Sequence, residues 1–343
     1  MIKVNKEYFY STLKTLLLTD SPSGFTMTIM EQIKDWTESL GYHYESTQKG
    51  TAIITIEGED NRKTVGLSAH VDTLGAMVRS ISTTGLLKFS LVGGPIVPTL
   101  DSEYCRIHTR EGKIFTGTFL STSPSSHVHK DAASLQRTPD TMEIRLDETV
   151  NNKQDVLDLG ISVGDFVCID PKTTIINDFV KSRFIDDKGS VACIFGVMEY
   201  LSTSGIKPKH QTKIVISAYE EVGHGASYLP EDISEMLAVD MGCIGDDLTC
   251  TEYDVSICAK DSSGPYDYHM TSKLIELSKL HDLKFAVDIY PFYGSDVSAA
   301  LRAGNNIKGA LVGPGVHASH GMERTHYSAL ENTMKLVYLV STD

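Results

Sequence analysis

The sequence lacks the long apolar runs and the basic clusters that are typical of membrane proteins and nucleic-acid-binding proteins. None of its apolar runs reaches the roughly 18 residues that a membrane-spanning helix needs. Its 343 residues carry a formal net charge of −14, and no basic cluster offsets that charge. Neither nucleic acid nor a membrane is therefore an expected partner. The first residues carry charges instead of an apolar signal-peptide stretch, so we expect a cytoplasmic protein.

The six cysteines show none of the spacings of a metal-binding or redox motif. There is no CxxC pair, and several of the cysteines lie in apolar runs. We therefore expect buried thiols in a reducing compartment. The GxGxxG, GxxxxGK[ST], GxSxG and HExxH motifs are also absent. Their absence argues against dinucleotide binding, P-loop phosphate binding, a serine nucleophile elbow and a helix-borne zinc site.

Two different periodicities divide the chain. The flanking parts alternate helical and strand-like segments, which predicts a mixed, mostly parallel sheet flanked by helices. From about residue 78 to 175, short strand-like runs alternate with turn signals and helical periodicity disappears. We therefore predict an α/β domain formed by residues 1–77 together with 176–343, and a small all-β domain, residues 78–175, inserted into it.

Polar residues follow the apolar strands of the predicted α/β domain. In "LSAHVDTLG", His70 and Asp72 share one face of a strand end, so His70 can bind a cation while Asp72 orients its other ring nitrogen. In "FIDDKGS", Asp186 and Asp187 open a predicted helix. One aspartate can cap that helix while the other faces a site. Each motif alone also has a purely structural explanation.

A second pair of carboxylates directly follows another apolar strand. Glu220 and Glu221 in "SAYEEVG" repel each other, and a cation would relieve that repulsion. One of them could bind a metal while the other acts as a general base. Asp240 follows the strand in "LAVDMG". The structural alternatives are a solvated acidic turn and a turn aspartate.

The segment "HASHGMERTH" is rich in histidine. It holds His317, His320 and His326 close to Glu323 and Arg324. One or two of these histidines could instead begin a helix or pack against neighbours. They nevertheless provide an imidazole near the end of the predicted α/β domain.

Taken together, these positions offer imidazoles and carboxylates at strand ends of one sheet. Mixed nitrogen and oxygen ligands suit zinc, cobalt or manganese. A carboxylate that bridges two ions, with two further ligands for each ion, would give a two-metal hydrolase centre. His127 and His129 in "SSHVHKD" also have ligand-like spacing, but they lie in the inserted block and are interpreted as loop residues.

The ordered set H-x-D, DD[KR]xG, EE-V-G, A-[IV]-D and a late S-H segment resembles the M42 metallo-aminopeptidases, which are sometimes called glutamyl aminopeptidase or endoglucanase M. The resemblance covers nearly the whole chain and implies a fold similar to the di-zinc exopeptidases. It also implies a role for each motif residue. In this sequence the roles fall on His70 and Asp240 for one metal, Glu221 and His320 for the other, Asp186 as the bridge, Glu220 as the general base, and Asp72 as the residue that orients His70.

The resemblance further implies a metal-dependent aminopeptidase that removes N-terminal residues from short peptides by means of a metal-activated water. It implies two divalent ions per subunit, with zinc expected and cobalt or manganese possible. A homo-oligomer is also implied, typically of twelve subunits assembled through the inserted domain. The sequence departs from the common His-Ser-Pro-x-Glu pattern, so His317 and His326 remain alternatives to His320.

Two other functions stay open at this point. A related di-metal fold could deacylate N-acyl amino acids or trim carboxyl-terminal residues. A non-catalytic peptide- or carbohydrate-binding subunit could also have retained the fold.

Overall fold

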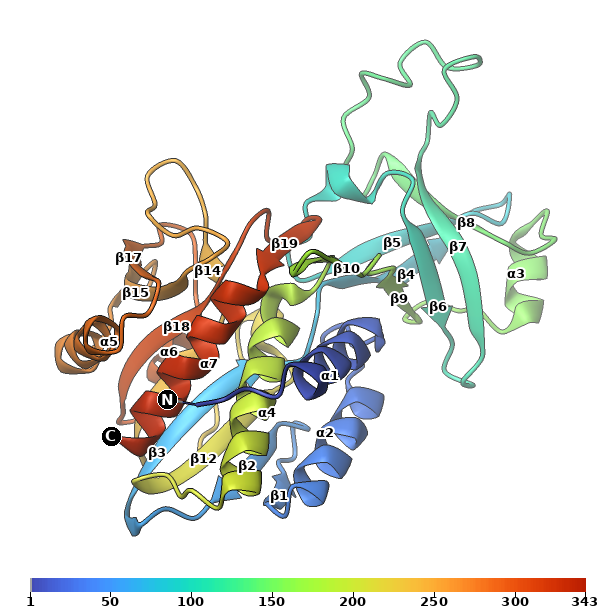
Figure 1. Ribbon diagram of the computed structural model, residues 1–343. Coiled ribbons are helices and arrows are strands. Elements are labelled where there is room, and N and C mark those ends of the chain that lie inside the picture. Colours follow the sequence, from blue (N-terminus) through green and yellow to red (C-terminus); the bar gives the residue numbers. More distant parts are fainter. Residues whose placement is uncertain (1) are drawn as a thin grey trace. The chain divides into compact units, whose positions relative to one another are not determined.

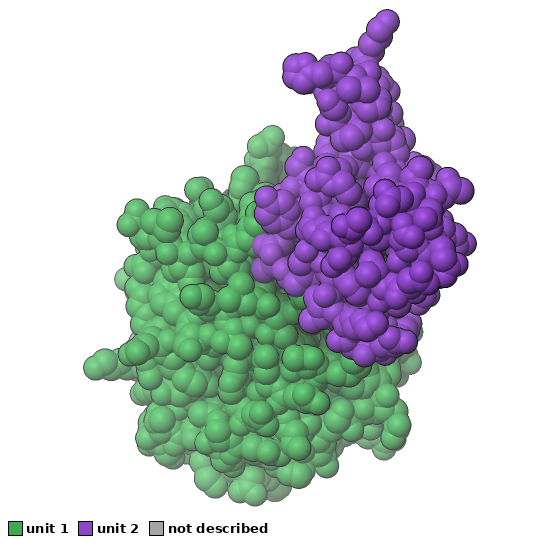
Figure 2. All heavy atoms as spheres, turned by 90° about the vertical axis from the view of Figure 1, so that its right-hand side faces the viewer, with its two compact units in different colours: residues 1–72, 172–343 green, residues 73–171 purple. Residues whose placement is uncertain are grey.

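The computed structural model describes residues 2–343, which form two compact units. The larger unit combines the residues up to Asp72 with Lys172–Asp343, and the smaller unit is Thr73–Pro171. Figure 1 shows the order of the elements, and Figure 2 distinguishes the two units by colour. The predicted fold class, a mixed sheet with flanking helices and a small β unit within the chain, is confirmed.

The larger unit is built on a sheet whose central strands are parallel. The strand order is β1-β2-β12-β3-β13-β18-β15-β16, with β14 beside β18 and β17 beside β15. The four central strands run parallel and are mostly buried, as expected for strands with both faces covered. They are β12 (His210–Ser217), β3 (Asp60–His70), β13 (Ile233–Val239) and β18 (Lys308–Val316). The others are β1 (His43–Ser46), β2 (Ala52–Ile56), β14 (Gly242–Cys243), β15 (Val255–Asp261), β16 (Gly264–Pro265) and β17 (Phe285–Ile289).

Three helices pack against one another beside this sheet. They are α1 (Lys6–Leu18), α4 (Ile185–Ser204) and α7 (Tyr327–Thr342), and α4 lies between the other two (Figure 1). Gly196 allows α4 and α7 to approach closely, because a Cβ atom at this position would lie 2.7 Å from the sulfur of Met334. The remaining helices are α2 (Met27–Ser39), α5 (Tyr268–Leu280), α6 (Asp296–Arg302) and the 3-10 turn η2 (Glu220–Val222). Within residues 2–343, no helix combines the length and the apolar character needed to cross a membrane.

A second sheet in the larger unit shows where the expected boundary differs from the structure. It consists of β10 (Thr174–Ile176), β11 (Phe179–Ser182) and β19 (Glu323–His326). The sequence pattern placed β10 at the end of the inserted block, but β10 pairs with β11 of the larger unit. The expected boundary at residues 77/78 also cuts through β4, which belongs to the smaller unit. Strand periodicity alone does not indicate which partner a strand will pair with.

The smaller unit is a closed six-stranded barrel. Phe89 and Phe119 are fully buried in it, and their rings meet edge to face with centroids 5.0 Å apart. His127 and His129 lie in the loop between β7 and β8, in keeping with their interpretation as loop residues. In barrel order the strands are β4 (Gly75–Ile81), β5 (Leu87–Val92), β8 (Met142–Leu146), β7 (Ile114–Ser121), β6 (Tyr104–His108) and β9 (Phe166–Ile169).

The expectation of an all-β unit was wrong in one respect, because the unit also contains η1 (Val97–Leu100) and the helix α3 (Lys153–Leu159). Asn152 and Asp155 form a capping box at the start of α3, and Gly160 ends it with a positive φ of 95°. These end signals were present in the sequence. A helix of two turns is too short to show a clear apolar period.

Candidate active site

The predicted site residues gather at the carboxyl ends of the central parallel strands of the larger unit. His70 is the last residue of β3, Asp240 follows β13, and Asp186 lies at the start of α4. Glu220 and Glu221 form the first residues of η2, directly after β12. This is the edge of an open α/β sheet where ligands bind.

His70 is buried, and its two ring nitrogens have different neighbours. Its Nδ1 lies 2.9 Å from the carbonyl oxygen of Asp72, so in the neutral ring this nitrogen carries the proton. Its Nε2 lies 3.3 Å from Asp186 Oδ1 and 3.8 Å from Glu220 Oε2. Nε2 is therefore the nitrogen that faces the carboxylates and could bind a cation.

The hydrogen bonds of the Asp72 carboxylate go to groups other than the His70 ring. The carboxylate is 3.6 Å from His70 Nδ1, farther than the carbonyl oxygen of the same residue. Instead it accepts hydrogen bonds from the main-chain N–H groups of Glu220 and Glu221, at 3.0 and 3.2 Å, and from the hydroxyl of Ser23, at 2.5 Å. Asp72 thus orients His70 through its main chain and fixes the η2 turn through its side chain.

Asp186 lies between two histidines. Its Oδ1 is 3.3 Å from His70 Nε2, and its Oδ2 is 3.6 Å from His320 Nε2. The same nitrogen of His320 is 3.6 Å from Glu221 Oε2. Burial raises the pKa of Asp186, but the hydrogen bond from His70 and the positive charges of His70 and His320 together outweigh this effect and hold the pKa below its ordinary value. A carboxylate whose two oxygens face two separate imidazoles has the arrangement of a bridging ligand.

Asp187 also belongs to the site, although the sequence analysis gave it no firm role. Its Oδ2 accepts the main-chain N–H of His70 at 3.1 Å, and it groups with His70 and Asp240 so that one ligand atom from each lies within 4.8 Å of the others. Asp186 and Asp187 form a cis-linked pair, and both have non-helical φ and ψ angles within the span of α4.

Asp240 is held at the site by close main-chain packing. Its main-chain N–H donates to the carbonyl of Val312 on the neighbouring strand β18 at 2.8 Å. A Cβ atom on Gly313 would overlap the carbonyl oxygen of Asp240, so only glycine allows this approach. Burial raises the pKa of Asp240 to about 7, and the negative charge of Asp186 adds to the effect.

Of the three late histidines, His320 is the one whose ring faces the site carboxylates. Its main-chain N–H donates to Glu323 Oε1 at 3.1 Å, and Glu323 Oε2 accepts the main-chain N–H of Asp186 at 3.0 Å. Glu323 therefore ties the histidine-rich segment to the start of α4. Its link to Asp186 could not be read from the sequence, because it joins positions far apart in the chain.

The two other histidines of this segment lie elsewhere. The ring of His326 accepts the N–H of Ser328 at the start of α7 and packs against Phe179, with ring centroids 4.9 Å apart. His317 is exposed and forms an isolated bridge with Arg324. The ring of His320, in contrast, lies 3.6 Å from a carboxylate oxygen of Asp186 and 3.6 Å from one of Glu221, so the geometry favours His320 over both alternatives.

Asp296, at the start of α6, is a buried carboxylate beside the site that the sequence analysis missed. It accepts the hydroxyl of Ser217 at 2.8 Å and the N–H of Ala226 at 2.9 Å, which connects the end of β12 to the loop after η2. Burial raises its pKa to about 6. The local sequence showed only a serine-capped helix start, "GSD", and gave no sign of this contact.

The donor set fits divalent cations. Asp187 Oδ1 and Glu221 Oε1 are buried and have no hydrogen-bond partner among residues 2–343. Burial raises the pKa values of Asp187, Glu220 and Glu221 well above the ordinary range, and neighbouring carboxylates add to the shift. Carboxylate oxygens without partners, crowded together beside histidine rings, are suitable ligands for a divalent cation. Zinc, cobalt and manganese all accept such a mixture of nitrogen and oxygen ligands.

The site opens into a cavity of about 240 Å³. The cavity is lined by the site residues Asp186, Glu220, Glu221, Asp240 and His320. The rest of the lining consists of Gly223, the segment 292–295 and two residues of α6, Ala299 and Arg302. The volume of this cavity suits a small group of a substrate, because pockets for drug-sized ligands begin at about 300 Å³.

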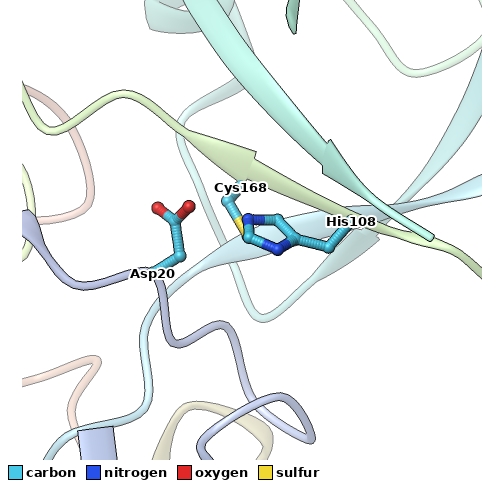
Figure 3. Close-up of side chains that lie close together, drawn as sticks. All are labelled: Asp20, His108 and Cys168. Atoms are coloured by element: carbon cyan, nitrogen blue, oxygen red, sulfur yellow. The ribbon is translucent and has the colours of Figure 1, made fainter. Parts of the chain in front are cut away.

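The cysteines stand apart from this chemistry. All six are free thiols, and five of them are buried, as expected. Cys168 on β9 and His108 on β6 belong to neighbouring strands of the barrel; Figure 3 shows their side chains and that of Asp20, which follows α1. None of these three residues contributes to the carboxylate and histidine group at the strand ends.

Known proteins resemble this chain in sequence. A model of the M42 glutamyl aminopeptidase family matches residues 50–336. A Bacillus subtilis (strain 168) protein named as an aminopeptidase, YhfE, is 44% identical over 328 residues, which cover 95% of each chain.

Solved structures show the same fold at low sequence identity. The TET aminopeptidase from the archaeon Thaumarchaeota archaeon SCGC AB-539-E09 superposes with a TM-score of 0.88 at 18% identity, covering 98% of this chain and 97% of that one. The TET1 peptidase of Pyrococcus horikoshii, described as assembling into a tetrahedron or a large octahedral shell, gives 0.85 at 21% identity, with 98% and 99% covered. The resemblance seen in the sequence motifs is confirmed, and the chain belongs to the M42 glutamyl aminopeptidase family, a family of peptide-bond hydrolases.

Proposed function

We propose that this chain is a two-metal aminopeptidase that hydrolyses the N-terminal peptide bond of short peptides. The observation that carries the proposal is the position of Asp186 between His70 and His320. His70 and Asp240 would hold one divalent cation, Glu221 and His320 the other, and Asp186 would bridge them. Zinc is the expected metal, and cobalt or manganese would suit the same ligands.

Divalent cations bound here would lower the pKa of an attacking water and polarise the scissile carbonyl. Glu220 is the site carboxylate that is not assigned to a metal ion, so it is available for proton transfer. Its Oε2 faces the site, 3.8 Å from His70 Nε2, and burial raises its pKa well above the ordinary value. Glu220 accepts the proton of the attacking water and then donates it to the leaving amine. The remaining negative charge around the cavity attracts the positively charged amino terminus of the substrate.

A homo-oligomer is part of this proposal. The tetrahedral assembly described for the Pyrococcus horikoshii relative supports it, and twelve subunits is the expected number. The inserted barrel is the proposed region of contact between subunits. Light scattering should give a mass near twelve times the 37.6 kDa of one chain, and a monomeric mass would contradict the assembly. The free thiols are consistent with a cytoplasmic location.

Substrate chemistry tests the reaction directly. The metal-loaded protein should cleave amino-acid p-nitroanilides with a free amino group and leave N-acetyl amino acids and N-blocked peptides intact. A chelator should abolish the activity, and zinc, cobalt or manganese should restore it. Cleavage of N-acetyl amino acids would instead support a deacylase, and the absence of turnover on every substrate would contradict an enzymatic role.

A further inference from the structure

The turn that joins β1 to β2 places Lys49 at the carboxyl end of β12. The start of β2 lies opposite the end of β12, because these two strands pair antiparallel. The turn is fixed by its own hydrogen bonds: the main-chain N–H of Thr47 donates to the carbonyl of Thr51 at 2.9 Å, and the N–H of Thr51 donates to the hydroxyl of Thr47 at 3.1 Å. Lys49 therefore lies at the same edge of the sheet as Glu220, which belongs to the turn after β12.

The ammonium group of Lys49 binds the loop that follows η2. Its Nζ donates to the carbonyl of Gly225 at 3.3 Å and to the hydroxyl oxygen of Ser227 at 2.9 Å. It also donates to the carbonyl of His224. Three acceptors from one short loop therefore share this single cation.

The peptide unit between Gly225 and Ala226 is bound at both ends by opposite charges. Lys49 donates to the carbonyl of this unit, and the carboxylate of Asp296 accepts its N–H at 2.9 Å. The negative end of the peptide dipole thus faces a cation, and the positive end faces an anion. Burial lowers the pKa of Lys49, and the negative charges of Asp296 and Asp72 act in the opposite direction. Lys49 and Asp296 together fix both the position and the direction of this peptide unit.

The same peptide unit lies against Glu220. A Cβ atom on Gly225 would lie 2.3 Å from Asp296 Oδ1 and 3.1 Å from the Cα atom of Glu220, so the loop passes directly beside the proposed general base. The main-chain N–H of Gly223 also donates to the carbonyl of Glu220 at 2.7 Å. A displacement of this loop would therefore displace Glu220.

We propose that Lys49 is a positioning residue for Glu220, an inference that rests on the proposed aminopeptidase function. The ammonium group holds the Gly225 peptide unit, and this unit keeps the Glu220 carboxylate where it accepts the proton of the attacking water. Proton transfer needs donor and acceptor within hydrogen-bond distance. A displacement of about 1 Å can therefore lower the rate about 100-fold.

Kinetics on leucyl p-nitroanilide provide the first test. Lys49→Met removes the charge and the donor N–H groups but keeps a side chain of nearly the same length. It should lower kcat by about 10- to 100-fold, change KM by less than about twofold and leave the metal content unchanged. Lys49→Arg keeps both the charge and the donors, so its kcat should stay within about threefold of the wild type. Lys63→Met is the matched control, because Lys63 binds Glu235 at 2.8 Å near the amino end of β3.

Hydrogen exchange measures the effect on the loop without any turnover. The main-chain N–H groups of Glu220, Glu221, Gly223 and Ala226 all donate hydrogen bonds in the folded chain. In Lys49→Met, peptides that cover residues 220–227 should exchange at least about threefold faster than in the wild type. The same peptides should exchange at the wild-type rate in Lys63→Met.

A double variant distinguishes positioning of Glu220 from a general structural role. If Lys49 acts through Glu220, its loss has little further effect once Glu220 can no longer accept a proton. Lys49→Met should therefore change kcat by less than about twofold in the Glu220→Gln background. A general structural role would lower kcat by the same factor in both backgrounds.

The possible outcomes separate this inference from the function on which it rests. If wild-type protein is active and Lys49→Met keeps kcat within about twofold, the assignment of Lys49 is overturned while the aminopeptidase function stands. An equal loss in both backgrounds overturns it as well. If wild-type protein cleaves no substrate, the proposed function fails. Faster exchange in Lys49→Met would then still support the hold of Lys49 on the loop, and unchanged exchange would overturn it.

Discussion

Glu220→Gln is expected to lower kcat by about 10²- to 10⁴-fold while the protein keeps both divalent cations, because the amide cannot accept the proton of the attacking water. The substitution preserves the size of the side chain and the main-chain N–H that donates to Asp72. Folding should therefore be little affected. Steady-state kinetics on a p-nitroanilide, together with metal analysis of the same sample, measure both parts of the prediction. Activity near that of the wild type would remove Glu220 from the mechanism.

Glu221→Gln provides a matched comparison, because it makes the same chemical change at the next residue. Glu221 Oε2 faces His320 at 3.6 Å, and its other oxygen is buried without a partner among the described residues. We expect this variant to lose affinity for one of the two ions, and excess metal should restore part of its activity. Glu220→Gln should not respond to excess metal. If the two variants show the opposite pattern, the roles of the two glutamates are exchanged.

The part of the site that lies at the ends of strands could be predicted from the sequence. The carboxyl ends of parallel strands lie along one edge of the sheet, so His70, Glu221 and Asp240 were expected to converge. The structure brings them together with Asp186 and His320. Contacts between segments that lie far apart in the sequence could not be predicted. Nothing in the local sequence indicated that Glu323 would accept the main-chain N–H of Asp186.

Asp187 and Asp72 show a second reason for incomplete prediction. An aspartate at a helix start has a common explanation as a cap, and that explanation concealed the position of Asp187 beside His70. For Asp72, spacing correctly indicated proximity to His70 but could not tell a carbonyl oxygen from a carboxylate. Residue type and period specify where a side chain points; they do not specify which of its atoms makes the contact.

The fold shows the same difference: features set by the residues of one segment could be predicted, and features set by contacts between segments could not. Apolar patterns identified the central strands of the sheet and the β character of the inserted unit. They did not assign β10 to its partner β11, because strand pairing depends on residues elsewhere in the chain. The short helix α3 was missed although its cap residues, Asn152 and Gly160, were visible in the sequence. Two turns gave too little periodicity to outweigh the surrounding strand pattern.

Removing the metal is expected to make the stability of the protein strongly dependent on pH. In the metal-free chain, burial raises the pKa of Asp240 to about 7 and that of Asp296 to about 6. The folded state therefore binds more protons than the unfolded state from about pH 4 upward. The free energy of unfolding must then fall as the pH rises through these values. His70 acts in the same direction, because nearby carboxylates, Asp186 first, outweigh burial and raise its pKa well above the ordinary value.

Each group whose pKa rises by one unit contributes about 1.4 kcal/mol, so several such groups together should destabilise the chelated protein by several kcal/mol between pH 5.5 and pH 8. Bound cations would replace these protons, and the metal-loaded protein should show little of this loss. Thermal unfolding with chelator and with zinc, at both pH values, measures the effect. Asp240→Asn removes one of the responsible carboxylates and should reduce the pH dependence of the chelated protein, whereas Asp178→Asn, at a partly exposed aspartate of the same unit, should not. A chelated protein that is as stable at pH 8 as at pH 5.5 would contradict the view that these buried carboxylates are held together for a cation.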